Sequence, residues 1–265
     1  IMYHDVREIR KKPKLVVIIL IDHESIHGLG KTIQSLNNQL YDQFETICIC
    51  TDNSSGYHEV QNKHTIVSKN PVCFLEDQGF ATFFKGCSGG LVGEFVLFIN
   101  ASDVMPCNAL FEIAKVLSES PHVKYVYSDE DTLDANGVRA CPFFKPDWSP
   151  DLLMSFPYTG SLSAFAWDQL LQVCSATTEL DSLNLYDLTL RFTECLEEHE
   201  IFHIPKVLVH RSATATEAEK HLQFFDAGPS EAHRRALVES LGRRGIQGEV
   251  VDGHRRGTFR VRRKP

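Results

Sequence analysis

Long apolar runs, paired cysteines and sequence repeats are all missing from this chain of 265 residues. The longest apolar run, Leu15 to Ile21, is much shorter than the roughly 18–20 residues of a membrane-spanning helix, so no such helix is predicted. The eight cysteines form no Cys-x-x-Cys pair and no cysteine–histidine spacing typical of zinc ligands. These absences exclude membrane-spanning, zinc-finger and repeat architectures.

The composition is that of an ordinary globular enzyme, with 43% hydrophobic and 23% charged residues. Cys48 and Cys50 alternate with isoleucines in an apolar segment, where a thiol acts as a small hydrophobic group. This use of cysteine favours a reducing compartment. We therefore expect a cytoplasmic location, with the inner face of the cell membrane as a further option.

Charge is unevenly distributed along the chain. Of the formal net charge of −8, residues 1–14 carry +3 and residues 254–265 carry +6, which leaves −17 for the body between them. Such an acidic body argues against a nucleic-acid partner, because duplex binding needs a cationic face. The basic ends have two interpretations, namely solvated linkers to neighbouring domains or peripheral contact with anionic lipid headgroups.

Apolar patterning predicts an α/β fold with a mostly parallel sheet. Residues 15–21 are apolar on both faces, as in a central strand, and a helical pattern over 29–36 then leads to a second strand at 44–51. Such a βαβ unit joins parallel strands. Further strands are predicted at 64–67, 95–99, 125–127, 201–210, 248–251 and 259–261, and further helices at 79–91, 107–118, around 188–192 and at 231–244.

Polar clusters follow three of these strands, at 52–56, 100–103 and 128–131. The carboxyl ends of strands in open α/β sheets are where ligands bind. The acidic residues from 128 and the aromatic run 143–151 are together predicted to form a functional loop.

Several motifs, and their order along the chain, resemble those of the family-2 glycosyltransferases with the GT-A fold. The likeness covers nearly the whole chain. The motifs from residue 127 onward are similar to a subgroup that builds bacterial surface polysaccharides, whose members often carry two such domains in tandem. The matching segments are 15–21 with 32–41, 52–55, 127–131 with 137–139, 144–153, 186–191 and 203–211.

The resemblance implies a single GT-A domain, a Rossmann-like and mostly parallel mixed sheet flanked by helices. It places this domain at 15–253, with a nucleotide-binding half at 15–127 and an acceptor half at 128–253. Basic segments, 1–14 and 254–265, flank it. The implied partners are a nucleotide-sugar donor, a glycan or lipid-linked acceptor and a second glycosyltransferase domain.

For the donor, the resemblance places Asp52 and Asn53 at the nucleobase and ribose, although these residues also suit a simple Asx turn. The family's Asp-x-Asp, which holds Mg²⁺ or Mn²⁺ on the diphosphate, falls on Asn100, Ser102 and Asp103. Two acidic positions have become neutral, so Asp103 and His210 are left as the implied metal ligands, a weak pair for a hard cation. Lys85 either faces the diphosphate or is a surface lysine.

The family's general base falls on Leu185, which cannot accept a proton, and the nearby Asp187 is its expected substitute. Two functions therefore remain possible, a sugar transferase and a catalytically inactive binding or scaffolding module of the same fold.

Acceptor hydroxyls would contact carboxylates and an indole ring. The alternative is that the indole packs in the core and the acids are solvated. The implied acceptor residues are Asp129, Glu130, Asp131, Trp148 and Asp151.

Overall fold

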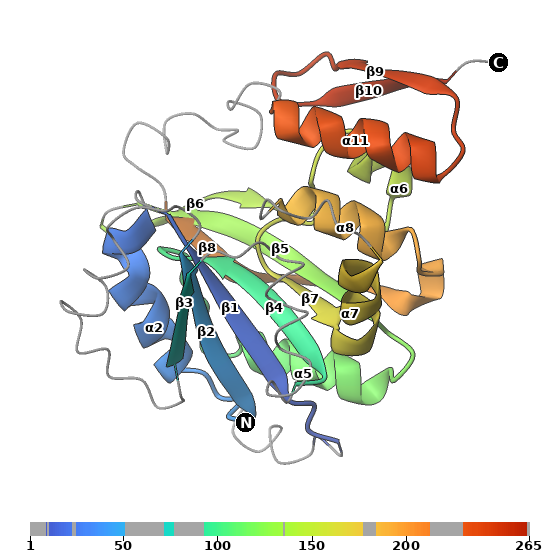
Figure 1. Cartoon of the computed structure of the whole chain (residues 1–265). Coiled ribbons are helices and arrows are strands. Elements are labelled where there is room, and N and C mark those ends of the chain that lie inside the picture. The colour runs from blue at the N-terminus through green and yellow to red at the C-terminus, as the bar shows by residue number, and fades with distance from the viewer. Residues whose placement is uncertain are drawn as a thin grey trace.

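An eight-stranded sheet forms the centre of the chain (Figure 1). The computed structural model describes residues 9, 11–22, 25–50, 72–76, 93–134, 136–176, 184–212 and 230–263. The strand order is β3-β2-β1-β4-β7-β5-β6, and β8 pairs with β5. The strands are β1 (Leu15–Ile21), β2 (Phe44–Cys50), β3 (Val72–Glu76), β4 (Phe95–Asn100), β5 (Tyr125–Leu133), β6 (Arg139–Phe143), β7 (Ser163–Ala166) and β8 (Ile201–Ser212).

Most of the long strands run in one direction. β1 pairs in parallel with β2 and β4, β2 with β3, and β5 with β8. β7 is antiparallel to both β4 and β5, so β4 and β5 share a direction. The carboxyl ends of β1, β2, β4, β5 and β8 therefore meet at one edge of the sheet, the edge at which α/β proteins bind ligands.

Helices cover both faces of the sheet and bury two apolar layers. Alternate side chains of β1 point to opposite faces, so Val17 and Ile19 pack toward α2 and α5, whereas Val16 and Ile18 pack toward α7, α8 and α11. The helices are α2 (Leu29–Asn37), α5 (Ala109–Glu119), α6 (Pro150–Leu153), α7 (Trp167–Ser175), α8 (Leu185–Thr193) and α11 (Glu231–Arg243), with short 3-10 turns η1 (Ser25–Gly28) and η3 (Glu198–Glu200).

The C-terminal part forms a second, two-stranded sheet beside α11 (Figure 1). β9 (Gly248–Asp252) pairs antiparallel with β10 (Phe259–Arg263), and Phe259 is buried in the core. Both short strands predicted here are present. Residues 259–263 of the basic C-terminal segment are thus part of folded structure rather than a bare linker.

The predicted central strands and the parallel βαβ unit are confirmed, but the predicted acidic loop is wrong. β5 continues through 128–131 to Leu133, because each acidic side chain there is buried against a basic partner described below. Strands β3, β6 and β7 and helices α6 and α7 are not among the predicted elements. The predicted strand at 64–67 and helix at 79–91 lie outside the described residues. Within the described ranges, no helix has the length and apolarity needed to cross a membrane.

Candidate donor and acceptor site

The turn after β4, where the family carries Asp-x-Asp, is closed by its own hydrogen bonds. The amide N–H of Asn100 donates to Asp103 Oδ2 at 3.2 Å, and the amide N–H of Asp103 donates to the carbonyl of Asn100 at 3.1 Å. Ser102 has a φ of +91°. Its N–H donates to Thr32 Oγ1 and its hydroxyl to the carbonyl of Ser25. The Ser102 hydroxyl hydrogen is therefore directed at the chain itself.

Asp103 lies beneath this turn and is only 4% exposed. Burial is the main cause that raises its pKa from 3.8 to about 7; Glu130 also raises it, whereas Arg211 and the Asn100 amide lower it. A carboxyl group buried this deeply, with one oxygen bound to an amide of its own turn, has little access to a cation.

The structure brings His210 and Asp131 together at the carboxyl ends of β8 and β5. They are register partners in the parallel pairing, and His210 Nδ1 lies 2.5 Å from Asp131 Oδ1. Arg139 donates to the other oxygen of Asp131 at 2.6 Å. His210 also forms a two-way main-chain bridge with Val104, which attaches the end of β8 to the turn after β4.

Asp129 and Glu130 are buried against basic side chains of the same chain. Lys145 donates to Glu130 Oε2 at 2.8 Å and to the carbonyl of Thr159 at 2.7 Å, and both charged side chains are fully buried. Burial lowers the pKa of Lys145, and Glu130 opposes this shift. Asp129 Oδ1 lies 2.9 Å from both the Lys145 amide nitrogen and His203 Nε2. The three acids predicted to bind an acceptor are thus neither solvated nor open.

The segment 144–153 packs against β5 and supports it. Trp148 is half-buried, with its ring centroid 6.5 Å from that of Tyr125 and 6.4 Å from that of Tyr158. Tyr127 donates its hydroxyl to the carbonyl of Pro146 at 2.8 Å. Asp151, in contrast, is 82% exposed and pairs with Arg263 at 3.2 Å. Of the predicted acceptor carboxylates, Asp151 is the one at the surface.

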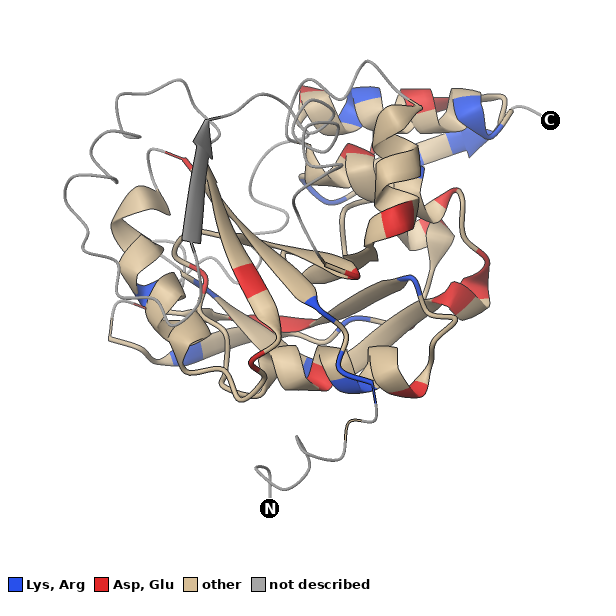
Figure 2. Cartoon of the chain, turned by 60° about the horizontal axis from the view of Figure 1, so that its bottom comes forward, with Lys and Arg blue, Asp and Glu red and all other residues tan. Residues whose placement is uncertain are grey.

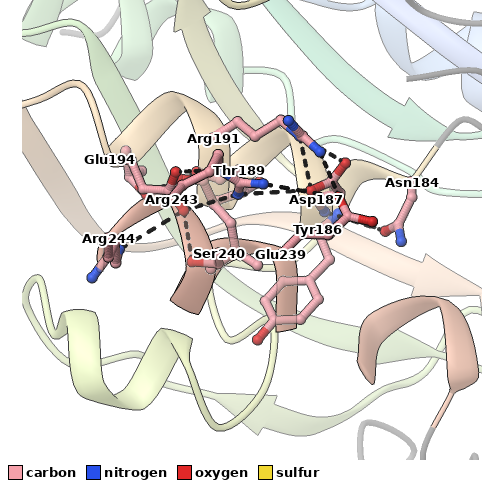
Figure 3. A network of polar contacts seen from close by, with 12 residues as sticks. Asn184, Tyr186, Asp187, Thr189, Arg191, Glu194, Glu239, Ser240, Arg243 and Arg244 are labelled. Atoms are coloured by element: carbon pink, nitrogen blue, oxygen red, sulfur yellow. Dashed lines mark hydrogen bonds and ion pairs between the residues drawn. The ribbon is translucent and has the colours of Figure 1, made fainter. Parts of the chain in front are cut away.

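Asp187 belongs to an ion-pair network that joins α8 to α11 (Figure 3). Arg191 Nε lies 3.0 Å from both oxygens of Asp187, and Arg243 reaches it at 4.0 Å. Arg191 also donates to Glu239 of α11 at 2.6 Å. The carboxylate of the predicted base is therefore committed to guanidinium groups, and Leu185 occupies the first residue of α8.

A cavity of about 520 Å³ borders the other side of the turn, between α2 and the β5–β6 connection. Ser102, Lys31, Asp134 and Ser212 contribute to its lining. One lysine and one aspartate balance each other, so this lining gives no excess of positive charge that would attract a diphosphate.

Three of the predicted donor residues, Asp52, Asn53 and Lys85, lie outside the described residues. Among those that are described, no cluster of three His, Cys, Asp or Glu side chains could hold a metal ion. The sequence prediction missed Lys145 and Arg211 as members of the site. The signals were available, since Lys145 lies within the motif 144–153 and Arg211 directly follows His210.

Comparison with known proteins gives sequence relatives that include a protein of O-antigen biosynthesis. No protein-family model matches the chain. The chain is 31% identical over 259 residues to the O-antigen biosynthesis protein RfbC of Myxococcus xanthus, an alignment that covers 93% of this chain and 19% of RfbC. The chain thus spans about a fifth of the length of that relative.

Solved glycosyltransferase structures match the fold. Residues 1–349 of TarS of S. aureus, in complex with UDP-GlcNAc, superpose with a TM-score of 0.53 at 17% identity, over 87% of this chain and 72% of that fragment. The mannosyltransferase PcManGT of Pyrobaculum calidifontis, in complex with GDP-Man and Mn²⁺, gives a TM-score of 0.53 at 14% identity, over 92% of this chain and 70% of PcManGT. The chain therefore has the GT-A glycosyltransferase fold and is similar in sequence to a bacterial O-antigen biosynthesis protein, as its motifs predict.

Proposed function

We propose that this domain binds a nucleotide-sugar donor and transfers its sugar to a growing surface glycan. The observation that carries the proposal is the similarity to RfbC across 93% of the chain, combined with a GT-A fold. TarS and PcManGT are solved with UDP-GlcNAc and GDP-Man, which makes a nucleoside diphosphate sugar the class of donor to test.

Such a transfer needs a pocket for the nucleobase, a counter-charge for the departing diphosphate and a group that accepts the proton of the acceptor hydroxyl. Asp52 and Asn53 are proposed to hold the nucleobase and ribose, and Lys85 to lie near the diphosphate. The turn Asn100–Asp103 lies at the carboxyl edge, where the donor would be bound.

Divalent cations bind carboxylate oxygens, and PcManGT is solved with Mn²⁺. The resemblance assigns such a cation to Asp103 and His210, but the contacts of these residues do not fit that role. Asp103 is buried with a raised pKa, and His210 Nδ1 is bound to Asp131. These two residues therefore do not form a site for the cation.

The alternative function is a binding or scaffolding module without turnover. The observation that favours it is the pairing of Asp187, because Arg191 contacts both of its carboxylate oxygens. Leu185 occupies the position where the family carries its base. An acceptor hydroxyl would have no ready proton acceptor at the start of α8. This module would bind a glycan, bind a nucleotide weakly or hold a catalytic partner domain.

Peripheral contact with an anionic membrane is proposed for the basic C-terminal end. The outer face of the β9–β10 sheet exposes Arg260 and Arg262, for which the described part of the chain offers no ion-pair partner, and Figure 2 shows basic residues gathered on this strand. Each arginine near an anionic lipid surface contributes about 1 kcal/mol to the free energy of membrane binding. Sedimentation with anionic vesicles should therefore weaken when Arg260→Gln and Arg262→Gln are combined, and unchanged sedimentation would reject this contact.

The donor proposal is tested by titrating the folded chain with UDP-GlcNAc, GDP-mannose and the corresponding nucleoside diphosphates, followed by a transfer assay on lipid-linked glycan. Nucleotide binding with transfer supports the enzyme. Binding without transfer on any acceptor supports the inactive module in its nucleotide-binding form. No binding to any nucleotide by a well-folded sample rejects the enzyme and leaves the glycan-binding or scaffolding module.

A further inference from the structure

We infer that the cavity between α2 and the β5–β6 connection binds an uncharged stretch of glycan, outside the donor edge. The identity of this ligand rests on the proposed function, in which a surface glycan is extended. The cavity measures about 520 Å³, which lies within the range of about 300–1,000 Å³ that is usual for ligand pockets. Ser102 of the turn after β4 contributes to its lining, so a glycan bound here stays beside the proposed site of transfer.

Helix α2 lines one wall of the cavity with a stripe of polar side chains. Lys31, Gln34 and Asn38 are spaced by three and four residues, which places them one above another along the helix surface. Another face of α2 is buried on the sheet through Leu29 and Ile33. Within the part of the chain that the structure describes, the three polar side chains form no hydrogen bond or ion pair. They are therefore available to a ligand.

The β5–β6 connection lines a second wall, and its own hydrogen bonds fix its shape. Asp134 Oδ1 accepts from the amides of Asn136 and Val138 at 2.9 and 2.7 Å. Gly137, at a φ of +79° that suits glycine, donates its amide to the carbonyl of Asp134 at 3.0 Å. Among the described residues, nothing contacts Asp134 Oδ2 or the side-chain amide of Asn136. This wall therefore offers a carboxylate oxygen and an amide at fixed positions.

Hydrogen bonds between α2 and the segment after β4 hold the cavity in a fixed shape. Ser35, on the floor of the cavity, accepts from the amide of Met105 at 3.2 Å. The side chain of Gln39 donates to the carbonyl of Pro106 at 2.9 Å and accepts from the amide of Leu110 at 3.0 Å. A pocket that is already formed loses little conformational entropy when a ligand binds.

The donors and acceptors of the lining match the hydroxyl groups of a sugar. Lys31 only donates and Asp134 only accepts, whereas the amides of Gln34, Asn38 and Asn136 do both, as a sugar hydroxyl does. Lys31 and Asp134 form no ion pair with each other, so both remain available. Their charges cancel, and no described lining residue is aromatic, which disfavours a diphosphate and a stacked nucleobase. An uncharged ligand rich in hydroxyl groups fits this set.

Cys107 gives a direct readout of occupancy, because its exposed free thiol lines the cavity. Its alkylation by iodoacetamide is followed by peptide mass spectrometry, with and without neutral trisaccharides of glucose, mannose or N-acetylglucosamine. At about ten times its Kd, at least one trisaccharide should slow this alkylation by up to about 10-fold, since about a tenth of the cavities stay empty. Alkylation of Cys195, an exposed cysteine that does not line the cavity, should be unchanged.

Gln34→Ala combined with Asn38→Ala should weaken the protecting affinity by about 30-fold, as expected for the loss of two neutral hydrogen bonds. The matched control is Gln172→Ala, which removes an exposed glutamine of α7 outside the cavity and should keep wild-type protection. Circular dichroism checks the fold of each variant. Affinity in the double variant within twofold of wild type would overturn the inference.

The nucleotide affinity of the same samples is titrated separately, so the two proposals fail separately. If a nucleotide binds and no trisaccharide protects Cys107, this inference is overturned and the donor proposal stands. If a trisaccharide protects Cys107 and no nucleotide binds, the glycan site stands and the transferase is rejected.

Discussion

His210 Nδ1 and Asp131 Oδ1 lie 2.5 Å apart, although 79 positions separate them in the sequence. The parallel register of β5 and β8 makes them direct neighbours, and both are buried. Asp131 also pairs with Arg139. One carboxylate thus connects the end of β8, the end of β5 and the β5–β6 hairpin.

Asp131→Asn should destabilise the fold by about 2–3 kcal/mol, because it removes the negative charge that His210 and Arg139 share in a buried site. Urea denaturation measures the free energy of unfolding. The control is Asp151→Asn, whose ion pair with Arg263 is exposed on both sides and should contribute less than about 1 kcal/mol. Equal losses in the two variants would contradict a structural role for the buried contact.

The Glu130–Lys145 pair should show strong coupling. Either Glu130→Gln or Lys145→Met alone leaves a buried group without its charged partner, and each should cost about 3–5 kcal/mol of stability. The double variant should lose less than the sum, because neither charge then remains. A double-mutant cycle in urea measures this coupling, and additive losses would show that the two charges do not depend on each other.

Asp103 should make the fold less stable as the pH rises. Its pKa is about 7 in the folded chain and 3.8 as the ordinary value, so between these pH values the unfolded chain releases a proton that the folded chain keeps. Stability from this group is complete below about pH 4 and is lost as the pH rises through about 7, by up to about 4 kcal/mol.

Asp103→Asn removes this titration, so it should gain stability relative to wild type between pH 5 and pH 8. The measurement is the free energy of unfolding of both proteins across that range. A difference between the two proteins that stays constant with pH would contradict the raised pKa.

Asp187→Asn should lower stability by about 1–3 kcal/mol, because it loosens Arg191 and Arg243 at the contact between α8 and α11 (Figure 3). Glu239→Gln, which removes another acid from the same network, is the matched control and should have a similar but smaller effect. If Asp187 instead accepts the proton in transfer, its variant loses about 100-fold or more in kcat with a changed pH profile, while Glu239→Gln keeps both.

The central strands were predictable because their apolar runs determine burial directly. β1 begins and ends at the predicted residues, and the parallel pairing with β2 follows from the βαβ pattern. β5 was not predictable beyond Tyr127, because its acids are buried only through basic side chains from distant segments. Lys145, His203 and His210 are these partners.

The candidate site was predictable as a location but not as a set of contacts. The motifs correctly indicate the fold and the carboxyl edge, since these depend on local pattern and strand direction. The role of Asp187 depends on arginines of α8 and α11, of which one is 56 positions away, and no local pattern reveals that pairing. The same holds for Arg211, whose acid is provided by another strand.

Calorimetric titration of the folded chain with UDP-GlcNAc and GDP-mannose, in EDTA and in Mn²⁺, tests the central claim most directly. The account predicts that one of the two donors binds and that its affinity in EDTA is close to that in Mn²⁺, because the described residues of the turn do not fit a metal. Failure of a well-folded sample to bind either nucleotide sugar or its nucleoside diphosphate would contradict the donor site.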